Sequence, residues 1–75
     1  MPEEISDKEA IEKAKQFLEK EGCLVIGVLE NSKSGDAHFI KASVKKDLLF
    51  NFVAIVRVDA NTGDCSLARF SKQGF

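Results

Sequence analysis

The sequence predicts an α+β fold, in which one N-terminal helix packs on one face of a four-stranded antiparallel meander sheet. An amphipathic pattern with helical spacing near the N-terminus is followed by four stretches rich in β-branched and aromatic residues. Short turn-forming segments separate these stretches, and short loops favour antiparallel pairing between strands that follow each other in the chain. A length of 75 residues corresponds to a single domain, 1–75.

The helix is predicted over residues 7–21. Ser6 and Glu9 have the spacing of a capping box, in which the Ser hydroxyl accepts a hydrogen bond from the Glu amide. Gly22 stands where a residue in the left-handed conformation commonly ends a helix. The apolar residues recur every three or four positions and form one stripe on an otherwise charged surface. These residues are Ala10, Ile11, Ala14, Phe17 and Leu18.

The strands are predicted at about 23–30, 37–45, 48–58 and 64–70. The third is rich in β-branched and aromatic residues, and read at period two it has one wholly apolar face. This face consists of Phe50, Phe52, Ala54, Val56 and Val58. We expect the apolar stripe of the helix to pack on this face, because both surfaces are apolar.

The opposite face of the third strand is too apolar to be exposed to water alone. A single helix is about 10 Å wide, so it covers only one face of a four-stranded sheet. The predicted interaction face consists of Phe39, Leu49, Val53, Ile55 and Arg57. A contiguous apolar patch of this kind is typical of interaction surfaces. We therefore expect it to bind a second copy in a two-fold homodimer, or another protein.

The hairpin between the last two strands resembles the signature of PepSY domains, in which a strand runs into a V-D-A-x-T-G turn. The matching residues here are 58–63, Val-Asp-Ala-Asn-Thr-Gly, and Ala10 and Ala14 look like the opening helix of that family. PepSY domains are small α+β modules of cystatin-like architecture that occur in peptidase propeptides and cell-envelope proteins. The resemblance implies a module that binds or inhibits other proteins, including a regulator of a peptidase.

No assembled set of acid, base and nucleophile is recognisable, so we predict a non-catalytic protein. His38 is the only histidine and follows a turn, where we expect it to be solvated. A second alternative to the interaction module is a small-ligand pocket between helix and sheet. Such a pocket would be lined by Phe17, Phe50 and Phe52.

The segment 59–64 has oxygen-bearing side chains at alternate positions, as a calcium loop does at its start. The glycine and the glutamate that an EF-hand loop needs further on are missing. A turn explains the same residues, because Asp59 and Asn61 can bond the nearby backbone and Gly63 can adopt a positive φ. The sequence therefore predicts a turn here, with no metal and no other cofactor.

Cys23 and Cys65 could form a disulfide, contribute to a metal site or remain free thiols. In a meander they lie on opposite edge strands, separated by three strand spacings of about 14 Å in total, which is beyond disulfide reach. A zinc site would need further ligands, and His38 is the only other soft candidate. Free thiols are therefore predicted.

Composition argues against nucleic-acid and membrane partners. The net charge is −1, whereas nucleic-acid-binding domains carry a strong basic field. Basic residues near Phe39 could stack single-stranded nucleic acid, but the RNP pattern is absent and such charges also protect apolar strands from aggregation. They are Lys41, Lys45, Lys46, Arg57, Arg69 and Lys72. The acidic N-terminus is unlike a signal peptide and no apolar run reaches transmembrane length, which predicts a cytoplasmic protein.

Overall fold

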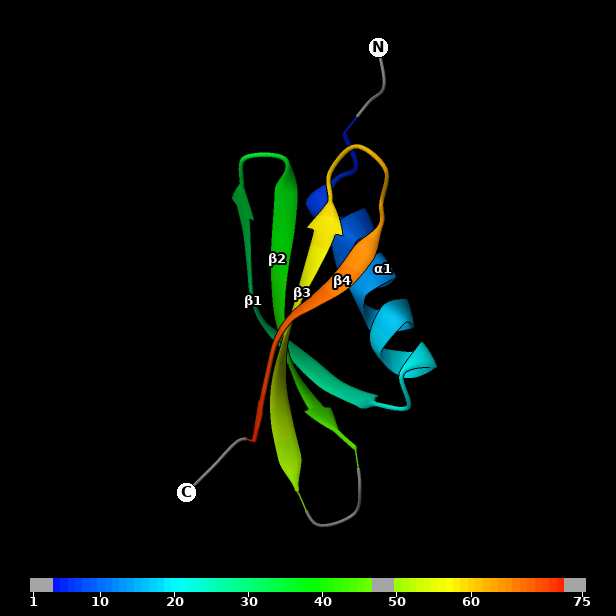
Figure 1. Cartoon of the computed structure of the whole chain (residues 1–75), viewed down its shortest axis with the longest axis vertical. Coiled ribbons are helices and arrows are strands. Elements are labelled where there is room, and N and C mark those ends of the chain that lie inside the picture. The colour runs from blue at the N-terminus through cyan, green and yellow to red at the C-terminus, as the bar shows by residue number, and fades with distance from the viewer. Residues whose placement is uncertain (1–3, 47–49, 73–75) are drawn as a thin grey trace.

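The computed structural model describes residues 4–46 and 50–72, and it confirms the predicted α+β architecture. The elements are α1 (Asp7–Lys20), β1 (Leu24–Ser34), β2 (Ala37–Lys45), β3 (Asn51–Asp59) and β4 (Cys65–Lys72). The strands form one antiparallel sheet in the order β1-β2-β3-β4, and α1 packs against one side of it (Figure 1). We call the side that α1 covers the inner face and the opposite side the outer face.

The ends of α1 are set by the local signals that the sequence predicts. The Ser6 hydroxyl accepts a hydrogen bond from the amide of Glu9 at 3.1 Å. At the other end Gly22 has a φ of 86°, and the amide of Cys23 donates to the carbonyl of Leu18 at 2.9 Å. This is the six-to-one bond of a Schellman motif, which turns the chain directly from the helix into β1.

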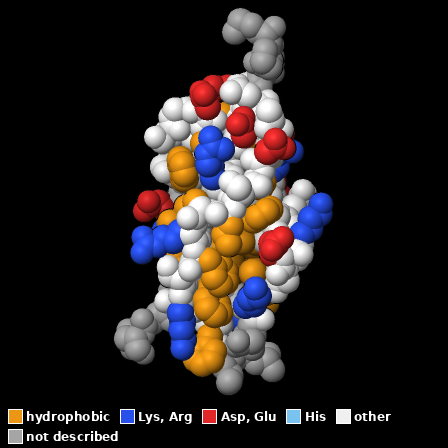
Figure 2. Space-filling model, in the orientation of Figure 1, with side chains coloured by type: hydrophobic (Ala, Val, Ile, Leu, Met, Phe, Trp, Pro, Cys, Tyr) orange, Lys and Arg blue, Asp and Glu red, His pale blue; other side chains and the backbone are white. Residues whose placement is uncertain are grey.

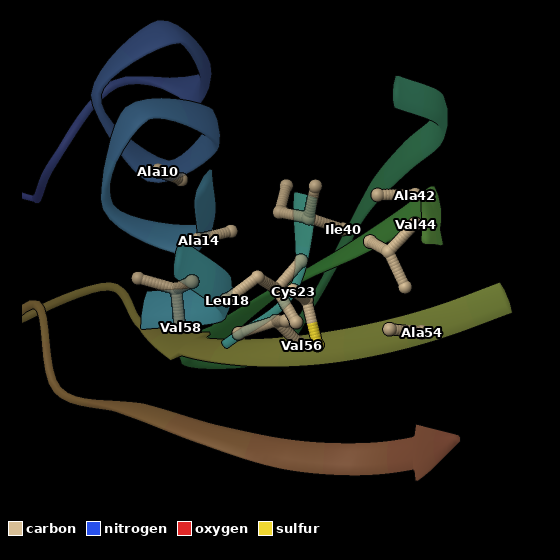
Figure 3. Close-up of a cluster of buried hydrophobic side chains, with 10 residues drawn as sticks. All are labelled: Ala10, Ala14, Leu18, Cys23, Ile40, Ala42, Val44, Ala54, Val56 and Val58. Atoms are coloured by element: carbon tan, nitrogen blue, oxygen red, sulfur yellow. The ribbon is translucent and has the colours of Figure 1, made fainter. Parts of the chain in front are cut away.

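The hydrophobic core lies between α1 and the inner face of β2 and β3 (Figure 3). Its fully buried members alternate along each strand, as the period-two pattern of β3 predicts. The buried cluster consists of Ala10, Ala14, Leu18, Cys23, Ile40, Ala42, Val44, Ala54, Val56 and Val58. Ile11, Phe17 and Phe52 are partly buried and pack against this cluster.

Phe50 departs from the predicted core. It lies on the same side of the chain as Phe52, but 41% of its surface is exposed. A helix of 14 residues is about 21 Å long, and β2 and β3 extend beyond its C-terminal end (Figure 1). The predicted contact between the helix and Phe50 is therefore wrong, because the strands are longer than the helix that covers them.

The first strand also differs from the prediction, because β1 continues to Ser34 rather than ending near residue 30. The polar residues 31–34 lie in the turn-forming segment between the two strands that the sequence predicts, and they pair with β2 instead, down to the pair of Ser34 with Ala37. Only Gly35, with a φ of 60°, and Asp36 form the loop. Pairing with a neighbouring strand has here overridden the turn propensity of the polar residues.

Candidate protein-interaction face

Pairing between β2 and β3 brings the predicted interaction residues together on the outer face. The cross-strand pairs are Phe39–Arg57, Lys41–Ile55 and Ser43–Val53. The residues between them on β2 point into the core, so these pairs point outward. The predicted members Phe39, Val53, Ile55 and Arg57 are each half-buried on this face. Leu49 lies outside the described residues.

A first β-bulge in β1 changes which residues of this strand face outward. Val25 and Val28 both pack against the core, although regular alternation would place residues three apart on opposite faces. The register shifts between Val25 and Gly27, so that Ile26 and Gly27 together oppose Ser43. With inward-facing residues before and after them, both residues of the bulge stand on the outer side.

A second bulge repeats this arrangement three residues later. Leu29 and Glu30 together oppose Lys41, between Val28, which packs against the core, and Asn31, which pairs with Ile40. Leu24, at the start of β1, also points outward, because the next residue, Val25, faces the core. The three large side chains of β1 are strongly exposed, with Leu24 at 64%, Ile26 at 54% and Leu29 at 53%. The outer face is thus more apolar than the sequence predicts.

The sequence gives only one signal for these bulges. Gly27 interrupts an otherwise apolar strand pattern, and an isolated glycine in a strand often marks a bulge. The second bulge has no such marker, and Glu30 ends the apolar run at that point. With Val25 facing the core, a reading at strict period two places Ile26 outward but turns Val28 outward and Leu29 inward.

A shallow basin lies in the β2–β4 part of the outer face. It has a volume of about 310 Å³ and is open to solvent on one side. Its lining residues are Lys41, Val53, Ile55, Arg69 and Ser71. Lys41, Ile55 and Arg69 form one row across three strands, and Val53 pairs with Ser71 in the next row. The basin therefore has an apolar floor from β3 and a cation on each side.

The surface view shows how apolar and basic side chains are distributed. Hydrophobic side chains gather in a band over the sheet, and Lys and Arg side chains lie on both sides of this band (Figure 2). Acidic side chains are concentrated towards the opposite end of this view, near the N-terminus (Figure 2). The order of the strands across this view reverses between its upper and lower halves, so the band is not confined to the outer face (Figure 1).

Some of the predicted basic residues are engaged with aromatic rings beyond the end of α1. Phe52 and Phe70 stack with ring centroids 4.8 Å apart and an interplanar angle of 21°. The Lys72 ammonium lies 3.7 Å from the centroid of Phe50, and that of Lys46 lies 5.7 Å from the centroid of Phe70. These cation–π contacts are within the chain, so these rings and lysines already stabilise one another.

A small cleft lies beside the C-terminal end of α1, and its volume is about 100 Å³. It is lined by Leu18, Glu21, Cys23, Lys46, Leu67 and Phe70. Of the three aromatic residues predicted to line a ligand pocket, Phe17 and Phe52 pack against the core and Phe50 is exposed. Pockets for drug-sized ligands have volumes of about 300–1,000 Å³. The cleft is therefore large enough for a side chain but not for a typical ligand.

His38 is not solvated, so the prediction for this residue is wrong. Only 3% of its surface is exposed. Its Nδ1 lies 3.3 Å from Oδ1 of Asp7, and its Nε2 lies 3.3 Å from the carbonyl oxygen of Ile5. The segment before α1 covers it, because the amide of Ile5 donates to the carbonyl of Ala60 at 2.9 Å. Both ring nitrogens thus face acceptors and connect the N-terminal segment to the sheet.

The loop after β3 is the turn that the sequence predicts. Oδ1 of Asp59 accepts hydrogen bonds from the amides of Asn61 at 2.8 Å and Thr62 at 3.0 Å. Gly63 has a φ of 80°. The two backbone hydrogen bonds hold the pKa of the Asp59 carboxyl below its ordinary value. Within the described residues, no group of three or more His, Cys, Asp and Glu side chains could hold a metal ion.

Both cysteines are free thiols. Cys23 is buried in the core, whereas Cys65 is half-buried and its Sγ donates to the carbonyl oxygen of Lys13 at 3.6 Å. Burial raises the pKa of the Cys65 thiol. Since the thiolate is the reactive form, Cys65 is a poor nucleophile in this position.

Comparison with known proteins gives no relative: no protein-family model, curated protein or solved structure matches this chain. Within residues 4–46 and 50–72, no helix has both the length and the apolar composition needed to cross a membrane.

Proposed function

We propose that this chain is a small non-catalytic protein-interaction module that binds a second copy or another protein through the outer face of its sheet. The observation that carries this proposal is the exposure of large aliphatic side chains on that face. Leu24, Ile26 and Leu29 are each more than half exposed, and the half-buried Val53 and Ile55 lie on the same face. Burying such a patch against a partner removes apolar surface from water.

The groups that could perform chemistry have structural roles, which supports a non-catalytic function. His38 connects the N-terminal segment to the sheet, and Asp59 accepts hydrogen bonds within its turn. The Cys65 thiol is held in its protonated form by burial, which raises its pKa. A PepSY-like regulator of a peptidase is a special case of this proposal, in which the peptidase is the partner.

Site-specific crosslinking tests the proposal. A photoreactive p-benzoylphenylalanine replaces Ile26 on the outer face or, as the matched control, Gln16 on the exposed side of α1. Illumination of cells that produce each variant should give a discrete adduct from position 26 and none from position 16. Introducing Ile55→Lys on the same face should abolish the adduct.

Mass spectrometry of the adduct identifies what binds. An adduct with the mass of two chains, each of 8.3 kDa, indicates self-association, and any other mass indicates a different partner. Equal adducts from positions 26 and 16, or none from position 26, would contradict the proposal.

A further inference from the structure

In the basin on the outer face, one apolar side chain has a cation on each side. Lys41 on β2 and Arg69 on β4 both pair with Ile55 on β3. Two strand spacings separate their backbones by about 10 Å. Both side chains are long enough to reach one anionic group above Ile55, and a guanidinium can bind a carboxylate through two parallel hydrogen bonds.

Among the residues that the structure describes, no acidic group forms an ion pair with these two cations. None of the residues that line the basin is acidic. Glu30 is the cross-strand neighbour of Lys41, yet the ion pairs among the described residues include neither Lys41 nor Arg69. Two cations that flank one side chain, and that have no ion-pair partner among the described residues, create a positive potential that attracts an anionic group.

The apolar residues of β1 continue the same two rows. Leu29 stands opposite Lys41, and Ile26 stands opposite Ser43. Gly27 and Ser43 are small, so the surface between Ile26 and Val53 is low. A complementary partner therefore presents large apolar side chains next to an anionic group on the same side.

A second copy packed by two-fold symmetry does not provide that complement. Such an interface brings the same patch of each protomer together. With the two-fold axis at the basin, Lys41 and Arg69 of one protomer would meet the cations of the other around the paired Ile55 side chains. Like charges brought together in an interface suppress association, so charge complementarity selects a different and acidic surface.

We propose that the basin binds a carboxylate side chain from an acidic segment of another protein, and that large apolar side chains beside this carboxylate pack on Ile26 and Leu29. This inference rests on the proposed function and specifies the chemistry of the partner. The carboxylate lies between Lys41 and Arg69, above Ile55. The apolar residues of the segment lie across β1 and β2.

Selection of displayed peptides tests this inference. A library of random twelve-residue peptides is selected for binding to the immobilised chain. Peptides that also bind the double variant Lys41→Glu/Arg69→Glu are removed. Enriched peptides should carry Asp or Glu next to large apolar residues. In fluorescence anisotropy, the best peptide should bind the double variant at least ten-fold more weakly than the parent, and it should bind more weakly at high salt.

The control variant Lys8→Glu/Lys20→Glu changes the net charge by the same amount on the exposed side of α1, and it should bind like the parent. Circular dichroism establishes that both double variants are folded. The enriched peptides could instead lack acidic residues and fail to bind the variant Ile26→Lys. That result would overturn the proposed acidic partner but keep the outer face as the binding surface. If no enriched peptide is sensitive to either change, both proposals are wrong.

Sedimentation of the parent chain at tens of micromolar completes the test. A monomer is expected. A dimer that disappears in Lys41→Glu/Arg69→Glu would mean that the acidic surface is supplied by another copy of the chain, and it would overturn a heterologous partner.

Discussion

The two faces of the sheet are built from the same strands and differ in the kinds of side chain that they carry and in how far these are buried. On the inner face, the central positions of β2 and β3 are aliphatic and at most 1% exposed. These positions are Ile40, Ala42, Val44, Ala54, Val56 and Val58. On the outer face, apolar and cationic residues alternate across β2, β3 and β4, and they are half-buried on β2 and β3, whereas Arg69 on β4 is exposed.

This difference follows from the single helix. Contact with α1 removes water from the inner face, and a charge there would lose its hydration without gaining a partner. The outer face keeps contact with water, so Lys41 and Arg57 can lay their aliphatic stems along Ile55 and Phe39 and keep their charges hydrated. The inner face is buried and apolar, whereas the outer face combines apolar and cationic groups, which the proposed binding of a partner requires.

The largest effect is expected where an inner-face contact is removed. Leu18 is one of the largest fully buried side chains and contributes to the core from α1. Leu18→Ala should lower the free energy of unfolding by about 2–5 kcal/mol, because it removes apolar contacts and leaves a cavity. Urea denaturation followed by circular dichroism measures this change.

Ile26→Ala is the outer-face control, and it should change stability by less than about 0.5 kcal/mol because Ile26 is exposed to solvent. If Leu18→Ala does not fold, Ile40→Val on the inner face should still cost about 0.5–1.5 kcal/mol. Equal costs on the two faces would mean that the outer face is packed as a core.

An intermediate effect is expected at the end of the inner face that α1 does not cover. Phe52 is partly buried and stacks on Phe70. Phe52→Ala should cost roughly 2–3 kcal/mol, less than a fully buried phenylalanine. A double-mutant cycle with Phe70→Ala should give a coupling energy of about 0.5–1.5 kcal/mol. A coupling of zero would mean that the two rings do not support each other.

A smaller effect is expected where the inner face contains a polar side chain. His38 is buried, and its two nitrogens face Asp7 and Ile5. His38→Ala should cost about 1–3 kcal/mol, because it removes these contacts and exposes the end of the core. Asp7→Asn keeps an oxygen acceptor and should cost less. A His38→Ala protein as stable as the parent would support the solvated position that the sequence predicts.

The smallest effect is expected in the turn after β3. Backbone hydrogen bonds lower the pKa of Asp59 below its ordinary value of 3.8. A lowered pKa in the folded state stabilises the fold above pH 3.8, and this contribution is lost as the pH falls through the lowered pKa. Asp59→Asn should therefore be less stable than the parent at pH 6, with a difference that shrinks in strong acid.

Carboxyl-carbon NMR measures this titration directly. The midpoint for Asp59 should lie below 3.8. A midpoint at or above that value would mean that the amides of Asn61 and Thr62 do not bond the carboxylate in solution.

The sequence by itself determined the features whose energies are local. Ser6 and Gly22 set the ends of α1, and Gly63 closes the last hairpin, because each acts on backbone groups within a few residues. The alternation of β3 assigned Val53 and Ile55 to the face opposite the core. The helix-on-sheet architecture follows from these signals together with the short loops.

Tertiary structure alone decided the features that depend on residues far apart in the chain. His38 is buried by Ile5, which lies 33 positions away in the sequence. Pairing with β2 extended β1 and placed the bulge that turns Val28 towards the core and Leu29 outward. The limited length of α1 left Phe50 exposed. Local propensity encodes the energies of neighbouring residues, whereas strand register and coverage depend on which distant surfaces finally meet.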